Sequence, residues 1–445
     1  MNTLDALLAE IVADPLEETR WLVLADWLEE FDDPRRAELL RLHRRLLATC
    51  CEPDAHPERA AWQAQVVAIL AADVRPCVPQ HSLALPGGVP LIGAFVPPGA
   101  FLMGGTEYDS EKPVHRVTLT AGFFLGVHPV TQLQWKAVMG TEPSQFKGPN
   151  RPVELVSWED CQEFCTKLTE GQQGIATVRL PTAAEWEWAC RAGTTTHFHF
   201  GDMLNTDLAN YNGTYTWNGS PKGKNRKKTT DVGAFLPNPW GLCDLHGNVW
   251  EWCADWHTPY TDDEQTDPYA NDKQSNEYRV LRGGSWNSNP QICRAAYRFR
   301  DAPANRSGDV GFRVCFRLDQ YYFLFDCFTI FSSRFAERSE AHALLFFRVP
   351  PVAPVPAVGG QLHPRRPGRC RGAPGAVGSV AGGRGATGRG DRGRTAEEAG
   401  AAEDFGRPRR TYPREARPEE EAEGEVIATT NERGPRDHPS ARGRW

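Results

Sequence analysis

The sequence lacks the features that mark a secreted or membrane protein. Its first fifteen residues, MNTLDALLAEIVADP, are acidic and contain neither a basic region nor a long apolar run, which argues against a secretory signal. The most apolar later stretch, residues 321–331, is short and interrupted by Asp326, so no membrane span is expected. The twelve cysteines are therefore expected to be reduced thiols in a cytoplasmic protein.

Several classes of site are also missing. The net charge of -7 gives no reason to expect nucleic acid or an anionic membrane as a partner. The central part of the chain has no G-x-S-x-G turn, no P-loop and no dinucleotide fingerprint, which excludes the common hydrolase and nucleotide-binding motifs. Hydrophobic residues make up 40% and charged residues 24%, which is ordinary for a soluble protein with a core, and 445 residues suggest two or three domains.

Residues 1–74 are expected to form a small helical bundle. Apolar residues recur at helical spacing, Pro15 closes a first helix, and Asp32-Asp33-Pro34 ends a second helix (17–31) and caps a third. The residues expected to face inward are Leu4, Leu7, Leu8, Ile11, Trp21, Leu24, Ala25, Leu28, Leu39, Leu42, Leu46 and Leu47.

Residues 75–93 are rich in proline and glycine and are expected to be a linker or a leading strand. Residues 94–317 are rich in tryptophan, glycine and asparagine, with short alternating pieces and few long helices, which predicts an α+β domain with much irregular loop. Two helices have clear start signals: the capping boxes that begin at Ser157 and Thr182 predict helices over 157–168 and 182–192. Gly193 suits the position after the second of them.

Residues 318–445 form a tail of different composition. From about residue 349 the chain consists mostly of glycine, arginine, proline, alanine and glutamate with almost no aromatics, so it cannot bury enough apolar surface to order itself. Disorder is the expectation for this tail, and translation of a GC-rich gene out of frame would give a similar composition.

An ordered series of motifs gives the central domain a family resemblance. The motifs are FLMGG (101–105), EKPVHRVTL (111–119), HPVT (128–131), RPVELVSWEDC (151–161), RLPTAAEWEWACRAG (179–193), LPNPWGLCDLHGNVWEWCADW (236–256), RVLRGGSW (279–286) and GFR (311–313). The domain resembles the formylglycine-generating (sulfatase-modifying factor) family, which implies a C-type-lectin-like fold. Residues 20–46 resemble the repeat-companion module of planctomycete proteins, which has no known activity and suggests a role in attachment.

The resemblance also implies a copper site that this sequence does not reproduce. In the oxidases of the family, two cysteines five residues apart, just after the RGGSW motif, hold Cu(I) between two thiolates. Here Ser288 and Cys293 stand at these positions, and a hard, protonated serine hydroxyl cannot replace a soft thiolate. Ser285 matches a position lining the reactive site, and Trp250 matches a wall of its cleft. We therefore expect a re-purposed or binding member with a protein or peptide partner. The alternative is a copper-dependent oxidase that uses Cys293 to convert a cysteine of a sulfatase to formylglycine.

Calcium is the metal that the resemblance supports better. The matching loop would offer side-chain oxygens from Asp244 and Glu251 and carbonyls from Gly247 and Val249, which are ligands suited to Ca²⁺. A second calcium site of the family would begin at Asn210 and Tyr211, but Lys224 and Arg226 stand where its acid is needed.

Two further metal sites are disfavoured by the sequence. An iron site of the sulfoxide-synthase type would have only His43 and His56 available in the N-terminal segment. The set Cys243, His246, Cys253 and His257 has zinc-ligand residue types, but its middle spacing is short, and core thiols and incidental histidines are the preferred interpretation. Cys161 and Cys165, one helical turn apart, are likewise expected to be buried structural cysteines.

Overall fold

The computed structural model of the chain describes residues 2–273 and 277–319. The expectation about the tail, 318–445, therefore falls outside the described residues except for Leu318 and Asp319. In the part that is described, no helix is both long enough and apolar enough to cross a bilayer.

The N-terminal segment is a bundle of four helices. They are α1 (Thr3–Ala13), α2 (Glu18–Phe31), α3 (Pro34–Ala48) and α4 (Arg59–Ala71). Asp33 caps α3 through a hydrogen bond of 3.0 Å from the backbone N–H of Arg35, as the Asp-Pro sequence predicts. Ile11, Trp21, Leu24 and Leu28 are buried together in the bundle core. The three expected helices are present, and α4 completes the bundle by packing on α3.

This helical module shares its core with the domain that follows. The guanidinium group of Arg59, which is buried, donates to the carbonyl of Leu46 at 2.8 Å and to the carbonyl of Gly193 at 2.7 Å. Cys50 belongs to the main hydrophobic cluster of the domain, and the ring of His43 packs edge-on against Trp240. The module is therefore joined to the domain by buried contacts.

Three sheets form the central domain within the described residues. The first has the order β1 (Gln80–Leu85), β2 (Val89–Val96), β5 (Phe123–Gly126), β12 (Cys315–Leu318), β6 (Ala176–Arg179) and is antiparallel throughout. The second has the order β10 (Phe299–Asp301), β9 (Arg279–Arg282), β7 (Trp250–Trp256), β11 (Val310–Gly311). The third has the order β3 (Gly99–Met103), β4 (His115–Leu119), β8 (Gln265–Thr266). Part of the segment expected as a linker, 75–93, thus forms β1 and the start of β2 as a hairpin.

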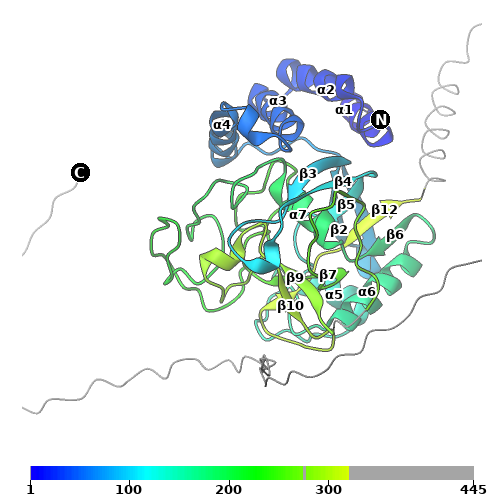
Figure 1. The fold of residues 1–445 in the computed structure, drawn as a ribbon. Helices are drawn as coiled ribbons and strands as arrows, with labels where there is room; N and C mark the ends of the chain where they lie inside the picture. Colours follow the sequence, from blue (N-terminus) through cyan, green and yellow to red (C-terminus); the bar gives the residue numbers. More distant parts are fainter. Residues whose placement is uncertain (1, 274–276, 320–445) are drawn as a thin grey trace, which may run out of the picture. The chain divides into compact units, whose positions relative to one another are not determined.

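Three helices accompany these sheets: α5 (Gln132–Met139), α6 (Trp158–Gly171) and α7 (Ala183–Arg191). The two expected capping boxes are present, at Ser157 with Asp160 and at Thr182 with Glu185, and a third begins α5 at Thr131. Helix α6 is amphipathic: it packs against α5 and β6, and buries Cys161, Phe164, Cys165 and Leu168. Figure 1 shows α5 and α6 side by side next to β6.

A long irregular stretch separates α7 from β7. Residues 192–249 contain no helix and no strand, only isolated bridges such as Asn210 with Gly247 and Asn212 with Asn225. In Figure 1 this stretch is drawn as long green loops. The mixture of helix, sheet and irregular loop agrees with the predicted α+β class.

Candidate functional site

Three fully buried arginines support the segment that carries the candidate site. Arg282, Arg294 and Arg313 are each at most 1% exposed, and each is paired with a buried glutamate. The pairs are Arg282 with Glu187 at 2.8 Å, Arg294 with Glu111 at 2.6 Å and Arg313 with Glu251 at 2.7 Å. Because a buried charge without a partner is strongly destabilising, each pair constrains the positions of the segments it joins.

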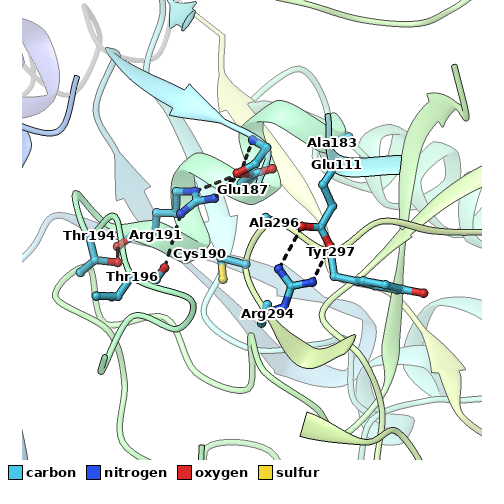
Figure 2. Close-up of polar contacts among 12 residues, drawn as sticks. Glu111, Ala183, Glu187, Cys190, Arg191, Thr194, Thr196, Arg294, Ala296 and Tyr297 are labelled. Atoms are coloured by element: carbon cyan, nitrogen blue, oxygen red, sulfur yellow. Dashed lines mark hydrogen bonds and ion pairs between the residues drawn. The ribbon is translucent and has the colours of Figure 1, made fainter. Parts of the chain in front are cut away.

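Two of these pairs fix residues 294–297, just after Cys293. The guanidinium group of Arg282 donates to the carbonyls of Ala295, Ala296 and Tyr297 at 3.0, 3.1 and 3.2 Å. Arg294 makes a two-pronged pair with Glu111, and Figure 2 shows this pair close to Arg191 and Glu187. The segment that directly follows the Cys293 turn is thereby anchored by two buried ion pairs.

Cys293 lies at the end of a short 3₁₀ turn and is completely buried. It packs in an apolar cluster with Phe198, Leu204, Ala209 and Tyr211, and burial raises the pKa of its thiol above the ordinary value. The sulfur donates to the carbonyl of Asn289 at 3.4 Å. Gly284 is needed beside it, because a Cβ at this residue, where φ is +75°, would lie 2.5 Å from the Cys293 sulfur.

Ser288 occupies a hydrogen-bonded network beside this thiol. Its hydroxyl oxygen accepts from the backbone N–H of Ser285 at 2.9 Å, and the same N–H also faces the Cys293 sulfur. The Ser285 hydroxyl is 3.1 Å from the Ser288 hydroxyl and 3.2 Å from a carboxylate oxygen of Asp309. Since a carboxylate only accepts, Ser285 donates to Asp309 and accepts from Ser288. The structure therefore brings Ser285, Ser288 and Cys293 together.

This arrangement does not fit a two-thiolate Cu(I) site. One of the two positions offers a hydroxyl engaged with Ser285, and the other offers a thiol whose deprotonation is opposed by burial. Trp250, expected to line the cleft, is buried on β7 with its ring stacked on Phe299 at 5.3 Å. Its backbone N–H donates to the carbonyl of Asp309 at 2.8 Å, which places it next to the serine network.

The loop expected to hold calcium is tightly wound. Asp244, Gly247 and Asn248 all have positive φ angles, and a Cβ on Gly247 would lie 2.3 Å from the carbonyl oxygen of Asn210. One carboxylate oxygen of Asp244 accepts from the N–H of Gly233 at 2.6 Å. The other is buried and has no hydrogen-bond partner in the described part of the chain. Burial raises the pKa of this carboxyl to about 6.

Glu251 differs from Asp244 because both of its carboxylate oxygens have hydrogen-bond partners. Its carboxylate accepts two hydrogen bonds from Arg313, both at 2.7 Å, and one from the indole N–H of Trp186 at 2.6 Å. The unpartnered oxygen of Asp244 is thus the feature of this loop that fits a hard cation, while Glu251 is engaged with Arg313. Val249, which was expected to offer its backbone carbonyl, is buried in the same loop.

At the second calcium position of the family, Arg226 turns inward. Its guanidinium donates to the carbonyls of Thr206 at 2.7 Å and Ala209 at 3.5 Å and lies over the ring of Phe235. Ala209 directly precedes Asn210, and Thr206 lies four residues before it. A fixed positive charge therefore occupies this part of the loop.

Among the described residues, no three histidine, cysteine, aspartate or glutamate side chains gather as a metal site. His246 instead holds the backbone of the candidate site: its Nδ1 is 2.8 Å from the carbonyl of Cys293, and its Nε2 accepts from the N–H of His199 at 3.3 Å. Burial lowers the pKa of His246 to about 4, so the ring is neutral and Nδ1 carries the proton. His43 is buried against Trp240, and burial lowers its pKa to about 3.

Sequence reasoning missed three contributors to this site. Asp309 was not singled out, although it directly precedes the Val310-Gly311-Phe312-Arg313 run. Glu187 and Glu251 were not recognised as buried counter-charges. A signal was available for both, since each glutamate stands between two tryptophans in an otherwise buried run.

Comparison with known proteins identifies the domain built around this site. The family model described as the sulfatase-modifying factor enzyme 1-like domain matches residues 93–318. A protein of Paenibacillus barcinonensis called chaperone protein LppX is 30% identical over 259 residues, which cover 48% of this chain and 86% of that protein. The formylglycine-generating enzyme of Mus musculus is 34% identical over 226 residues, which cover 48% of this chain and 56% of that enzyme.

Among solved structures, Treponema denticola variable protein 1 is 29% identical, with a TM-score of 0.46, covering 53% of this chain and 98% of that one. The family match extends over half of the chain and includes the buried Arg–Glu pairs, the serine network and the Asp244 loop. The chain belongs to the family of proteins with a sulfatase-modifying factor enzyme 1-like domain.

Proposed function

We propose that this protein is a binding member of the family that does not carry the two-thiolate copper centre. The observation that carries the proposal is the network around Ser288, whose hydroxyl bonds to Ser285 where a thiolate would be required. Within this network Asp309 accepts from both Ser285 and Ser307, so the polar groups satisfy one another. The alternative, an oxidase acting on a sulfatase cysteine, is supported by the retained position of Cys293 beside Ser285.

Titration of the full chain with Cu(I), in competition with a chromogenic chelator, distinguishes the two functions. The binding function predicts no tight Cu(I) site in the parent and a gain of Cu(I) binding in Ser288→Cys, because both positions face the Ser285 N–H. Cys293→Ser serves as the control. Tight binding by the parent that disappears in Cys293→Ser would overturn the proposal in favour of the oxidase, and aldehyde formation on a sulfatase peptide would then be measured.

We further propose that Ca²⁺ binds at the 244–251 loop, with Asp244 as the side-chain ligand and Gly247, Val249 and Glu251 as the remaining positions implied by the family. The buried, unpartnered oxygen of Asp244 supports this assignment, because Ca²⁺ prefers such hard oxygens. In this proposal calcium stabilises a C-type-lectin-like fold whose long loops bind a protein or peptide partner such as a sulfatase.

The helical module is proposed to be a repeat-companion module that serves in attachment. Its buried contacts with the domain, through Arg59 and Cys50, support a fixed rather than a freely tethered role. We also propose a cytoplasmic location. The ten cysteines within the described residues are all free thiols, which suits a reducing compartment.

A further inference from the structure

A strongly basic loop lies in the irregular stretch between α7 and β7. Residues 221–228 read PKGKNRKK, and the side chains of Lys222, Lys224, Lys227 and Lys228 point to solvent, all four residues being exposed. Within the described part of the chain, none of the four ammonium groups forms an ion pair or a hydrogen bond. Two acidic residues of the same stretch are engaged elsewhere and do not pair with these lysines. Asp202 accepts a hydrogen bond from the backbone N–H of His197, and Asp231 pairs with Arg151.

The loop is held by its backbone and not by its lysines. The N–H of Gly213 donates to the carbonyl of Lys224 at 3.3 Å, and the N–H of Gly223 donates to the carbonyl of Gly213 at 2.7 Å. The amide of Asn210 donates to the carbonyl of Lys228 at 3.0 Å. Arg226 turns inward between the lysines and anchors the loop at the carbonyl of Thr206. The four charges are therefore presented outward from an ordered backbone.

These contacts place the loop beside the candidate site. The N–H of Asn212 donates to the carbonyl of Ser288 at 2.9 Å, and Asn212 is bridged to Asn225 in the middle of the basic loop. The loop thus borders the turn that joins Ser285 to Cys293. A partner that docks at this turn would meet the lysines directly.

Exposed apolar side chains adjoin the lysines. Tyr215, which is 55% exposed, belongs to the hairpin closed by Gly213 and Gly223. Met203 is 56% exposed and lies against Gly219 of the same hairpin: a Cβ added to this glycine would be 3.5 Å from the Met203 sulfur. Such a mixture of cationic and apolar groups suits a peptide that carries both acidic and apolar residues.

We propose that the 221–228 loop, together with Tyr215 and Met203, binds an acidic peptide segment of a partner protein. The inference rests on the proposed binding function and names the chemistry of the partner. Residues 222–228 span at most about 20 Å, which matches about six residues of an extended peptide. An acidic peptide is favoured over nucleic acid because the chain as a whole carries a net charge of -7, which would repel a long polyanion outside this loop.

The test measures binding of a fluorescein-labelled peptide of alternating glutamate and alanine, about twelve residues long so that it exceeds the loop, to the full chain by fluorescence anisotropy. The perturbed protein carries Lys222→Glu, Lys224→Glu, Lys227→Glu and Lys228→Glu. The matched control carries Lys112→Glu, Lys136→Glu and Lys167→Glu, three lysines that already pair with Asp109, Glu142 and Glu163. Circular dichroism checks that each variant is folded.

The parent is expected to bind the peptide more weakly as salt is raised, and the reversed loop is expected to raise Kd by about tenfold or more. The control variant is expected to bind like the parent. The proposal is overturned if the parent does not bind the peptide, if the control variant loses as much affinity as the reversed loop, or if a single-stranded oligonucleotide of equal charge binds as tightly as the peptide. Cu(I) titration depends on Ser288 and Cys293 and not on the lysines of the 221–228 loop. A result that overturns peptide binding by this loop can therefore be distinguished from a result that overturns the proposed function.

Discussion

Replacing Glu187 by glutamine should be among the most destabilising single changes in the domain. Its carboxylate is completely buried and accepts four hydrogen bonds. One oxygen accepts from the N–H of Gly104 at 2.9 Å and from Arg191 at 2.8 and 2.9 Å, and the other accepts from Arg282 at 2.8 Å. An amide at this position has one acceptor and one donor, so in either orientation its NH₂ group faces a guanidinium.

The magnitude follows from the burial of the two arginines. Arg282 is 0% exposed and Arg191 is 7% exposed, and glutamine would leave both without their anionic partner. Breaking a buried pair in this way costs about 3–5 kcal/mol of unfolding free energy. The control is Glu163→Gln, which removes the i,i+4 partner of Lys167 at 2.7 Å, where the side chains are 56% and 44% exposed. An exposed pair of this kind contributes about 0–1 kcal/mol.

Urea unfolding of the full chain measures both variants at pH 7. A loss in Glu187→Gln no larger than the loss in Glu163→Gln would refute the reasoning, because it would mean that the buried pair constrains nothing. The pH dependence gives a second reading. Burial acts to raise the pKa of Glu187, but Arg191 and Arg282 outweigh it and hold the pKa below the ordinary 4.5. The stabilisation is then present above pH 4.5 and is lost as the pH falls through the lower folded-state pKa. The parent should therefore lose stability in acid more steeply than Glu187→Gln.

Three further changes test the site and its attachment. Gly284→Ala should lower the unfolding free energy by about 2 kcal/mol or more, because its Cβ would lie 2.5 Å from the Cys293 sulfur at a φ of +75°; an unchanged urea midpoint would contradict this geometry. Ca²⁺ should raise the melting temperature of the parent by binding the folded state, and Asp244→Asn should abolish the rise; an equal rise in both proteins would remove Asp244 from the site. Arg59→Ala should make the helical module more susceptible to limited proteolysis, because its hydrogen bond to the Gly193 carbonyl at 2.7 Å is lost. If the variant is cleaved as slowly as the parent, this contact is not needed to hold the module on the domain.

Local signals in the sequence predicted local structure well. The Ser157 and Thr182 capping boxes each place a hydroxyl and a carboxylate three residues apart, and both helices begin where these pairs predict. The same signal was present at Thr131 with Gln134, but the short helix α5 was not predicted from it. No separate signal was identified for helix α4, which was covered only by the general expectation that residues 1–74 form a helical bundle.

The candidate site depends on contacts that local patterns do not encode. The family resemblance assigned Ser288 and Cys293 to the two thiolate positions, and in the structure the Ser285 N–H faces both residues. Asp309 reaches the same network from 24 residues away in sequence, and Glu111 reaches Arg294 across 183 residues. Such pairings are set by the way the sheets fold over one another, so local patterns in a single sequence do not show which charged residues become partners.

The position of strand β12 has a consequence for how the chain acquires its structure during synthesis. This strand, the last of the described domain, lies between β5 and β6 and pairs with both. While the ribosome is still translating the residues before Cys315, the edges of β5 and β6 have no strand between them, and unpaired strand edges favour aggregation. The first sheet can therefore close only after β12 has left the ribosome, and until then β5 and β6 remain without the strand that joins them.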